Sequence, residues 1–201
     1  MNKHLLVDWI PFEVNPRVIQ ESLKENNGKL VVSGVLQRAD AKNQNGRIYP
    51  RPILERESQK YTQLVKERRA LGELDHPDSS VVNLSNVSHN IIEMSWDGAD
   101  LIGTVEILTT PAGNILRELF KNGIKLGISS RGLGSTTAAE DGTQEVQEDF
   151  ELIAFDFVSN PSTQGAFLSP LQESLNRKQL LRENPYYKVN RIITDILVEM
   201  K

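Results

Sequence analysis

The run from Phe150 to Val158 constrains the fold most, because it is the most apolar stretch of the chain and also contains a carboxylate, Asp156. From Leu152 onward, apolar side chains occupy both alternating faces of an extended chain, which predicts a strand covered by protein on both sides. An unpaired carboxylate is costly to bury. The chain therefore needs packing on both faces of this strand and a cationic or hydrogen-bonding partner for Asp156.

The composition is that of one globular domain with or without a tail: 201 residues, 38% of them hydrophobic and 25% charged. With 27 acidic against 23 basic residues and a net charge of -4, the chain lacks the basic surface that nucleic acid or an anionic membrane requires. The absence of cysteine excludes disulfides, thiol catalysis and cysteine-ligated metals. No apolar run approaches the length of a membrane span, so we expect a cytoplasmic protein.

Apolar periodicity and turn residues predict the remaining elements. We expect strands at residues 3–10, 29–38, 84–96 and 100–108, and helices at 52–69 and from Pro111 to about Gly123. A polar connection between the first two strands and a polar loop at 134–145 complete the domain. The sequence pattern changes near Pro170, where the helical spacing of apolar residues predicts an amphipathic terminal helix. The expected organisation is a domain at 1–169 and a helical tail at 170–201.

A second stretch, residues 126–135, suggests chemistry. A short apolar segment runs into Ser129, Ser130 and Arg131, and glycines follow. On an extended chain Ser129 shares its face with Gly127, which predicts space over the hydroxyl, and Ser130 points the other way. Ser129 is the candidate nucleophile, Ser130 remains an alternative or a supporting residue, and Arg131 or a backbone N–H beside it is the candidate oxyanion donor.

A serine nucleophile needs a base, and His76 is the first candidate. Pro77 biases His76 away from helical angles, toward a strand end or loop. Ser129 would attack a carbonyl, His76 would take and return the proton, and Asp156 would hold the imidazole. The chain order His, Ser, Asp differs from those of chymotrypsin, subtilisin and the nucleophile-elbow hydrolases, and the serine segment lacks the G-x-S-x-G pattern.

Two alternatives remain open on these residues. His89 could replace His76 as base or Asp156 as third member. A metal site could instead use carboxylates and imidazoles, although their spacing matches no H-E-x-x-H pattern; its candidate ligands are Glu73, Asp75, His76, Asp78 and His89.

Four motifs together resemble the T-even-like phage prohead core proteases, over roughly residues 30–168. They are residues 45–50 (Asn-Gly-Arg-Ile-Tyr-Pro), 72–77 (Gly-Glu-Leu-Asp-His-Pro), 127–134 (Gly-Ile-Ser-Ser-Arg-Gly-Leu-Gly) and 156–162, from Asp-Phe-Val to Pro-Ser. The resemblance implies a serine endopeptidase of the herpesvirus-assemblin type, with His76 and Ser129 catalytic and Asp156 in the third position. It also implies an α+β fold: a mostly antiparallel, β-barrel-like core surrounded by helices, as in the herpesvirus proteases.

The same resemblance implies a role in head maturation inside the assembling prohead, in the host cytoplasm. Scaffold and capsid proteins are the expected substrates, and we expect a homo-oligomer with no cofactor, metal, nucleic acid or membrane partner. Cleavage after Leu-x-Glu or Ile-x-Glu makes Glu173 the first candidate for self-cleavage and Glu21 the second, because termini leave a fold more easily than core strands. The non-enzymatic alternative is an inactive internal scaffold or head structural protein.

Overall fold

The computed structural model describes residues 3–12, 14–75 and 79–159. The strands are β1 (His4–Phe12), β2 (Leu30–Arg38), β3 (Arg47–Ile48), β4 (Leu71–Glu73), β5 (Val87–Asp97), β6 (Asp100–Ile107), β7 (Leu126–Gly134), β8 (Thr136–Ala138), β9 (Gln144–Val146) and β10 (Glu151–Ser159). The helices are α1 (Pro16–Glu25), α2 (Arg51–Lys66), α3 (Pro111–Lys121) and a short 3-10 helix, η1 (Leu84–Asn86). Every strand and helix predicted within the described residues is present, with ends shifted by a few residues.

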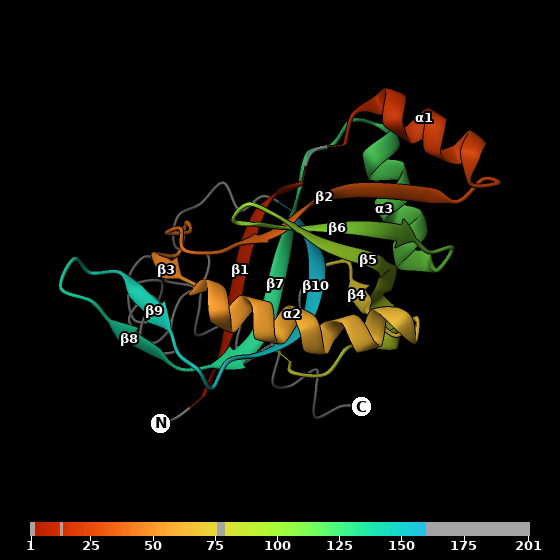
Figure 1. Cartoon of the computed structure of the whole chain (residues 1–201). Coiled ribbons are helices and arrows are strands. Elements are labelled where there is room, and N and C mark those ends of the chain that lie inside the picture. Colours follow the sequence, from red (N-terminus) through yellow and green to blue (C-terminus); the bar gives the residue numbers. More distant parts are fainter. Residues whose placement is uncertain (1–2, 13, 76–78, 160–201) are drawn as a thin grey trace, which may run out of the picture. The chain divides into compact units, whose positions relative to one another are not determined.

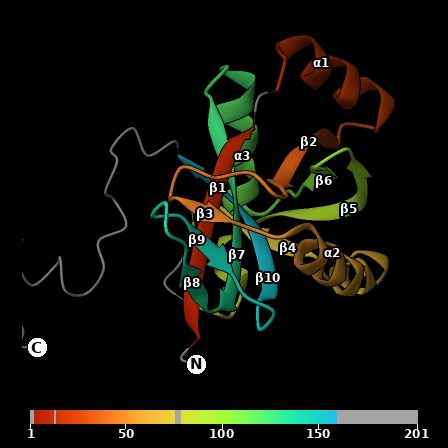
Figure 2. The same ribbon diagram turned by 60° about the vertical axis from the view of Figure 1, so that its left-hand side comes forward.

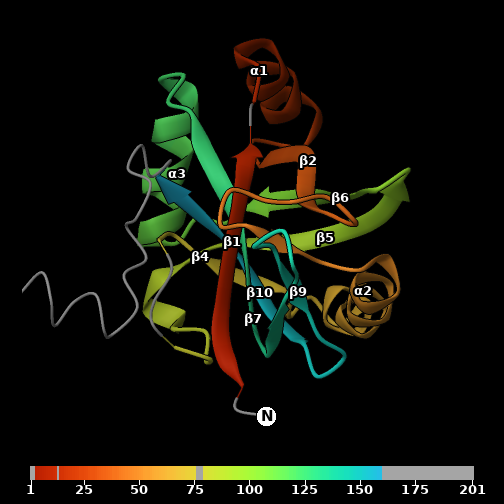
Figure 3. The same cartoon turned by 90° about the vertical axis from the view of Figure 1, so that its left-hand side faces the viewer.

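Two antiparallel sheets make up most of the structure (Figure 1). One has the strand order β1-β7-β10 and the other the order β2-β6-β5-β4, and their strands cross at a large angle (Figure 3). They meet where Leu74 forms a parallel bridge with Phe157 of β10, beside the hydrogen bond from Asp75 N to Phe157 O. The predicted barrel-like core is therefore realised as two crossed sheets, which do not close into a barrel over the described residues.

The core lies where these sheets face each other, and β10 supplies its centre. Phe157 packs edge-on against Phe12 of β1 and Phe120 of α3, with ring centroids 5.1 and 5.3 Å apart respectively. Phe155 makes a similar contact with Tyr61 of α2. Residues 154–158 are all buried, which confirms the prediction of a strand covered on both faces.

The connection between β1 and β2, predicted to be polar, contains α1. Asn15 caps this helix by accepting a hydrogen bond from Arg17 N. Ile19 is buried in the core, and Ser22 Oγ donates to Val31 O of β2, so tertiary contacts support a helix whose sequence is largely polar.

The loop predicted at 134–145 is likewise partly regular. It contains the hairpin β8–β9, which turns through Gly142 at a φ of 79° and joins β3 in a third, small sheet. Figure 2 shows β9 of this hairpin next to β3, with which it pairs. None of the described helices is both long enough and apolar enough to cross a bilayer.

Candidate active site

The candidate nucleophile lies on the central strand of the β1-β7-β10 sheet. Ser129 is paired in register with Trp9 of β1 and Asp156 of β10, so these three side chains share one face of the sheet. Ser129 is 1% exposed, and its Oγ has no hydrogen-bond partner among the described residues. The space predicted over this hydroxyl is taken in part by Trp9, because a Cβ at Gly127 would lie 2.8 Å from the indole ring.

Ser130 lies on the opposite face, as strand alternation predicts. Its Oγ accepts a hydrogen bond from Gln37 Nε2 at 2.7 Å and donates to Asp8 O at 3.3 Å. The hydroxyls of the two serines therefore differ: that of Ser130 has two partners and that of Ser129 has none within the described part of the chain.

The motif at residues 45–50 folds against this second face. Asn45 Nδ2 and Arg47 Nη1 donate to Asp8 Oδ1 at 2.6 and 2.9 Å, and Tyr49 OH donates to Asp8 Oδ2. Burial, followed by the neighbouring carboxylate, raises the pKa of the Tyr49 phenol well above its usual value. The network links β1 to the segment that leads into α2.

The partner that Asp156 requires is Arg131. The guanidinium donates from Nε to Asp156 Oδ2 at 2.8 Å and from Nη2 to Asp156 Oδ1 at 3.2 Å. Nη2 also donates to Glu73 Oε1 at 3.0 Å, and both ion pairs are fully buried. Burial raises the pKa of the Asp156 carboxyl, and the Arg131 charge opposes this shift.

The other donors of Arg131 reach the chain beyond β4. Nη1 donates to Ser79 O at 2.7 Å and to Val81 O at 3.5 Å. All five N–H groups of the guanidinium therefore have acceptors. The sequence pointed to Glu73 only as a metal ligand. Its role as the second carboxylate of this cluster depends on a tertiary contact with Arg131 that no local sequence pattern indicates.

His76 and Asp78 lie outside the described residues. The alternative base, His89, is fully buried, and both of its ring nitrogens have partners: Nε2 lies 2.9 Å from Phe155 O, and Nδ1 lies 2.9 Å from Ser88 Oγ. Because a carbonyl can only accept, Nε2 carries the proton and Nδ1 accepts from the Ser88 hydroxyl. Burial lowers the pKa of His89 to about 4, so the ring is neutral at pH 7.

Comparisons with known proteins agree with the motif pattern. The sequence profile of the prohead core protein serine proteases matches residues 7–176. The chain belongs to this family. It is 34% identical over 145 residues to the prohead core protein protease of Enterobacteria phage T4, an alignment that covers 70% of this chain and 68% of the relative. Its fold is similar to the solved structure of the bacteriophage T4 capsid assembly protease, gp21, with a TM-score of 0.69 and 27% identity over 80% of this chain and 100% of the other.

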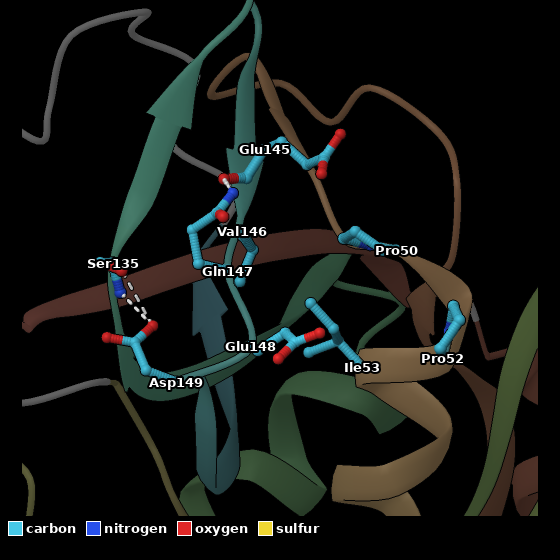
Figure 4. A pocket seen from close by; sticks show the side chains of 9 residues that line it. All are labelled: Pro50, Pro52, Ile53, Ser135, Glu145, Val146, Gln147, Glu148 and Asp149. Carbon is cyan, nitrogen blue, oxygen red and sulfur yellow. Dashed lines mark hydrogen bonds between the residues drawn. The ribbon is translucent and has the colours of Figure 1, made fainter.

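Cavities open at two places on the described part of this prohead protease. One, of about 640 Å³, lies between the start of α2 and the β8–β9 hairpin, and none of the candidate catalytic residues lines it (Figure 4). The other, of about 390 Å³, is bordered by Trp9 and the two residues that follow it on β1. Arg38 and Lys42 also line this second cavity, and none of its lining residues is acidic. No residue of β7 lines it, but it is bordered by β1, which pairs with the serine strand.

The remaining candidates are the proposed self-cleavage sites and the proposed metal ligands, and they lie in different parts of this family member. Glu21 lies exposed on α1, and Glu173 lies outside the described residues. Of the five proposed metal ligands, Glu73 is paired with Arg131 and His89 is held by Ser88 and Phe155. Among the described residues, no group of three or more histidine, aspartate or glutamate side chains is arranged to hold a metal.

Proposed function

We propose that the chain is a serine endopeptidase of phage head maturation, which degrades scaffold and trims capsid proteins inside the assembling prohead. Ser129 is the nucleophile, His76 the general base and acid, and Asp156 the carboxylate that orients the imidazole. The observation that carries the proposal is the buried Ser129 Oγ, without a partner among the described residues and on the same sheet face as Asp156, in a chain of the prohead protease family.

The chemistry follows from these groups. The His76 imidazole removes the proton from Ser129 Oγ as this oxygen attacks the scissile carbonyl, and then protonates the leaving amine. A water molecule releases the acyl group by the same proton transfers in reverse order. Asp156 can serve here while paired with Arg131, because a carboxylate has about four acceptor sites and the described hydrogen bonds occupy three of them.

The second cavity supports a preference for cleavage after Leu-x-Glu or Ile-x-Glu. It adjoins the strand that pairs with Ser129, it combines apolar with cationic side chains, and it has no acidic lining residue. Such a surface accommodates an aliphatic side chain and a glutamate in nearby subsites. We also propose that the crossed sheets, joined through β4 and β10, correspond to the core of the herpesvirus proteases.

The experiment is labelling of the purified chain with a fluorophosphonate, followed by peptide mapping and intact mass. Wild type should be labelled at Ser129 alone. Ser129→Ala and His76→Ala should each lower turnover of a Leu-x-Glu peptide by roughly four to six orders of magnitude, and Asp156→Asn by roughly three to four. Circular dichroism confirms that each variant is folded. A folded wild-type chain that is never labelled and never cleaves a peptide would instead be a scaffold or head structural protein.

A further inference from the structure

We propose that Arg131 is a positioning residue, which fixes the two described ends of the stretch 73–83, residues 73–75 and 79–83, against the strands that carry Ser129 and Asp156. This inference rests on the proposed function, because the stretch includes the proposed base, His76. The guanidinium would act on catalysis through the segment that it anchors, without itself receiving the oxyanion.

The anchor holds the stretch on both sides of His76. Before it, Glu73 N donates to Asp156 Oδ1 at 3.0 Å and Glu73 Oε1 accepts from Arg131. After it, the carbonyls of Ser79 and Val81 accept from Arg131 Nη1. One side chain from the serine strand therefore binds both flanks of the segment.

Glu73 links the two ends of the stretch to each other. Besides accepting from Arg131, its Oε1 accepts from Asn83 N at 3.0 Å, which links the end of the stretch to its beginning. Two backbone bonds continue the anchoring: Leu74 N donates to Asn86 O at 3.0 Å, and Asp75 N donates to Phe157 O at 2.7 Å. The Arg131 cluster and these backbone bonds together attach the described parts of the segment to β7 and β10.

The number of N–H donors on Arg131 distinguishes this positioning role from direct contact with the oxyanion. Each of the five N–H groups of Arg131 has an acceptor, and the side chain is fully buried. To reach an oxyanion, the guanidinium would have to give up a bond to a buried carboxylate or carbonyl, which would leave that acceptor unsatisfied. Arginine suits an anchor better than lysine does, because its planar fork can bind two carboxylates and two carbonyls at once.

The test uses Arg131→Lys in the full-length protein. This substitution keeps the positive charge and removes most of the hydrogen bonds that the guanidinium donates. Two quantities are measured: amide hydrogen exchange and the rate of fluorophosphonate labelling at Ser129. We expect the amides of Glu73 and Asn83 to exchange about tenfold faster or more than in wild type, without matching acceleration in the β5–β6 hairpin. Labelling should slow by about 100-fold, as expected when a catalytic group is misplaced.

Arg47→Lys is the matched control, because it weakens another arginine–carboxylate pair, in which Asp8 is buried and Arg47 is 23% exposed. Among the described residues this pair makes no contact with the stretch. It should speed exchange near residues 43–50, leave that of Glu73 and Asn83 unchanged, and leave labelling within about twofold of wild type.

Three results would overturn the proposal. Slower labelling of Arg131→Lys with wild-type exchange at Glu73 and Asn83 would indicate direct contact with the reacting atoms. Faster exchange with wild-type labelling would show that the anchoring has no catalytic effect, and no change in either would show that there is no anchor. Should Arg131→Lys fail to fold, the same two measurements are made on Glu73→Gln, which weakens the buried cluster while keeping a side chain of similar shape.

The hydrogen-exchange result does not depend on enzymatic activity. A wild-type chain that is never labelled would therefore refute the proposed function without bearing on the anchoring of the stretch.

Discussion

Ser129 and Ser130 are adjacent in sequence, but their surroundings on β7 differ in a way that can be tested. Ser130 Oγ joins Gln37 to the main chain of β1, so Ser130→Ala leaves the buried Gln37 amide without that acceptor. We expect this variant to lose about 1–3 kcal/mol of unfolding free energy and to retain fluorophosphonate labelling at Ser129. Urea unfolding and peptide mapping measure the two effects. Loss of labelling in a Ser130→Ala protein that is still folded would transfer the nucleophile to Ser130.

His89 predicts a pH dependence of stability. Its pKa is about 4 in the folded protein and 6.5 ordinarily, so between these pH values the unfolded chain binds a proton that the folded chain does not. This contribution to stability is complete above pH 6.5 and is lost as the pH falls toward 4. It amounts to no more than about 3 kcal/mol.

The measurement for His89 is urea unfolding at neutral and mildly acidic pH, for wild type and His89→Gln. Glutamine can still donate to Phe155 O but does not titrate, so the loss of stability on acidification should be smaller in the variant by about 2–3 kcal/mol. The other acid-titrating groups are common to both proteins and cancel in the comparison. An equal loss in both proteins would show that His89 does not remain neutral through this range.

Among the secondary-structure elements, β4 packs so closely on β5 and β10 that it tolerates no side chain at Gly72. A Cβ there would lie 2.0 Å from Phe155 O and 2.3 Å from His89 Nε2. Because the carbonyl belongs to a core strand and cannot move cheaply, Gly72→Ala should cost about 3 kcal/mol or more of unfolding free energy. At Gly142, where φ is 79° and the space is open, alanine should cost only about 1 kcal/mol through backbone strain. Thermal unfolding of both variants tests this; equal costs would contradict the close contact.

The elements that sequence patterns predicted correctly are those with apolar periodicity, such as α2 and α3, together with the continuous apolar run of β10. The helix α1 was missed because few of its residues are apolar, and its stability depends on burying Ile19 and on the bond from Ser22 to β2. The hairpin β8–β9 was missed because its short, polar strands are defined by pairing with each other and with β3. Local composition carries little information about such tertiary support.

At the candidate site, the sequence predicted the need for a partner to Asp156 but not its identity. A buried carboxylate on a doubly covered strand requires a cationic or hydrogen-bonding partner, and that much follows from polarity alone. That the partner is Arg131 depends on the register of β7 against β10, in which Arg131 lies opposite Ala154 and Ser129 opposite Asp156. Register is set by the whole sheet and cannot be read from either strand by itself.

For the molecule as a whole, self-processing is the prediction with the largest effect. Glu173 is the favoured site, and cleavage there would remove residues 174–201. Cutting after Glu21 would require α1 to unwind and Ile19 to leave the core, so we expect it to be slower. Intact mass of the active protein at rising concentration should show loss of the 174–201 fragment, and Glu173→Gln should abolish this loss. An active enzyme that retains its full mass while cleaving other substrates would contradict self-processing.

The strand that carries Ser129 lies between the first and the last strands of the described domain, β1 and β10. During synthesis, β7 leaves the ribosome with only one of its two sheet neighbours available, and Asp156 is still inside the ribosome when Arg131 emerges. A nascent chain that stops before residue 151 has the serine but neither the third strand nor the carboxylate. Ribosome-bound intermediates and prematurely terminated products should therefore be inert, which delays proteolysis until each copy of the domain has been fully translated.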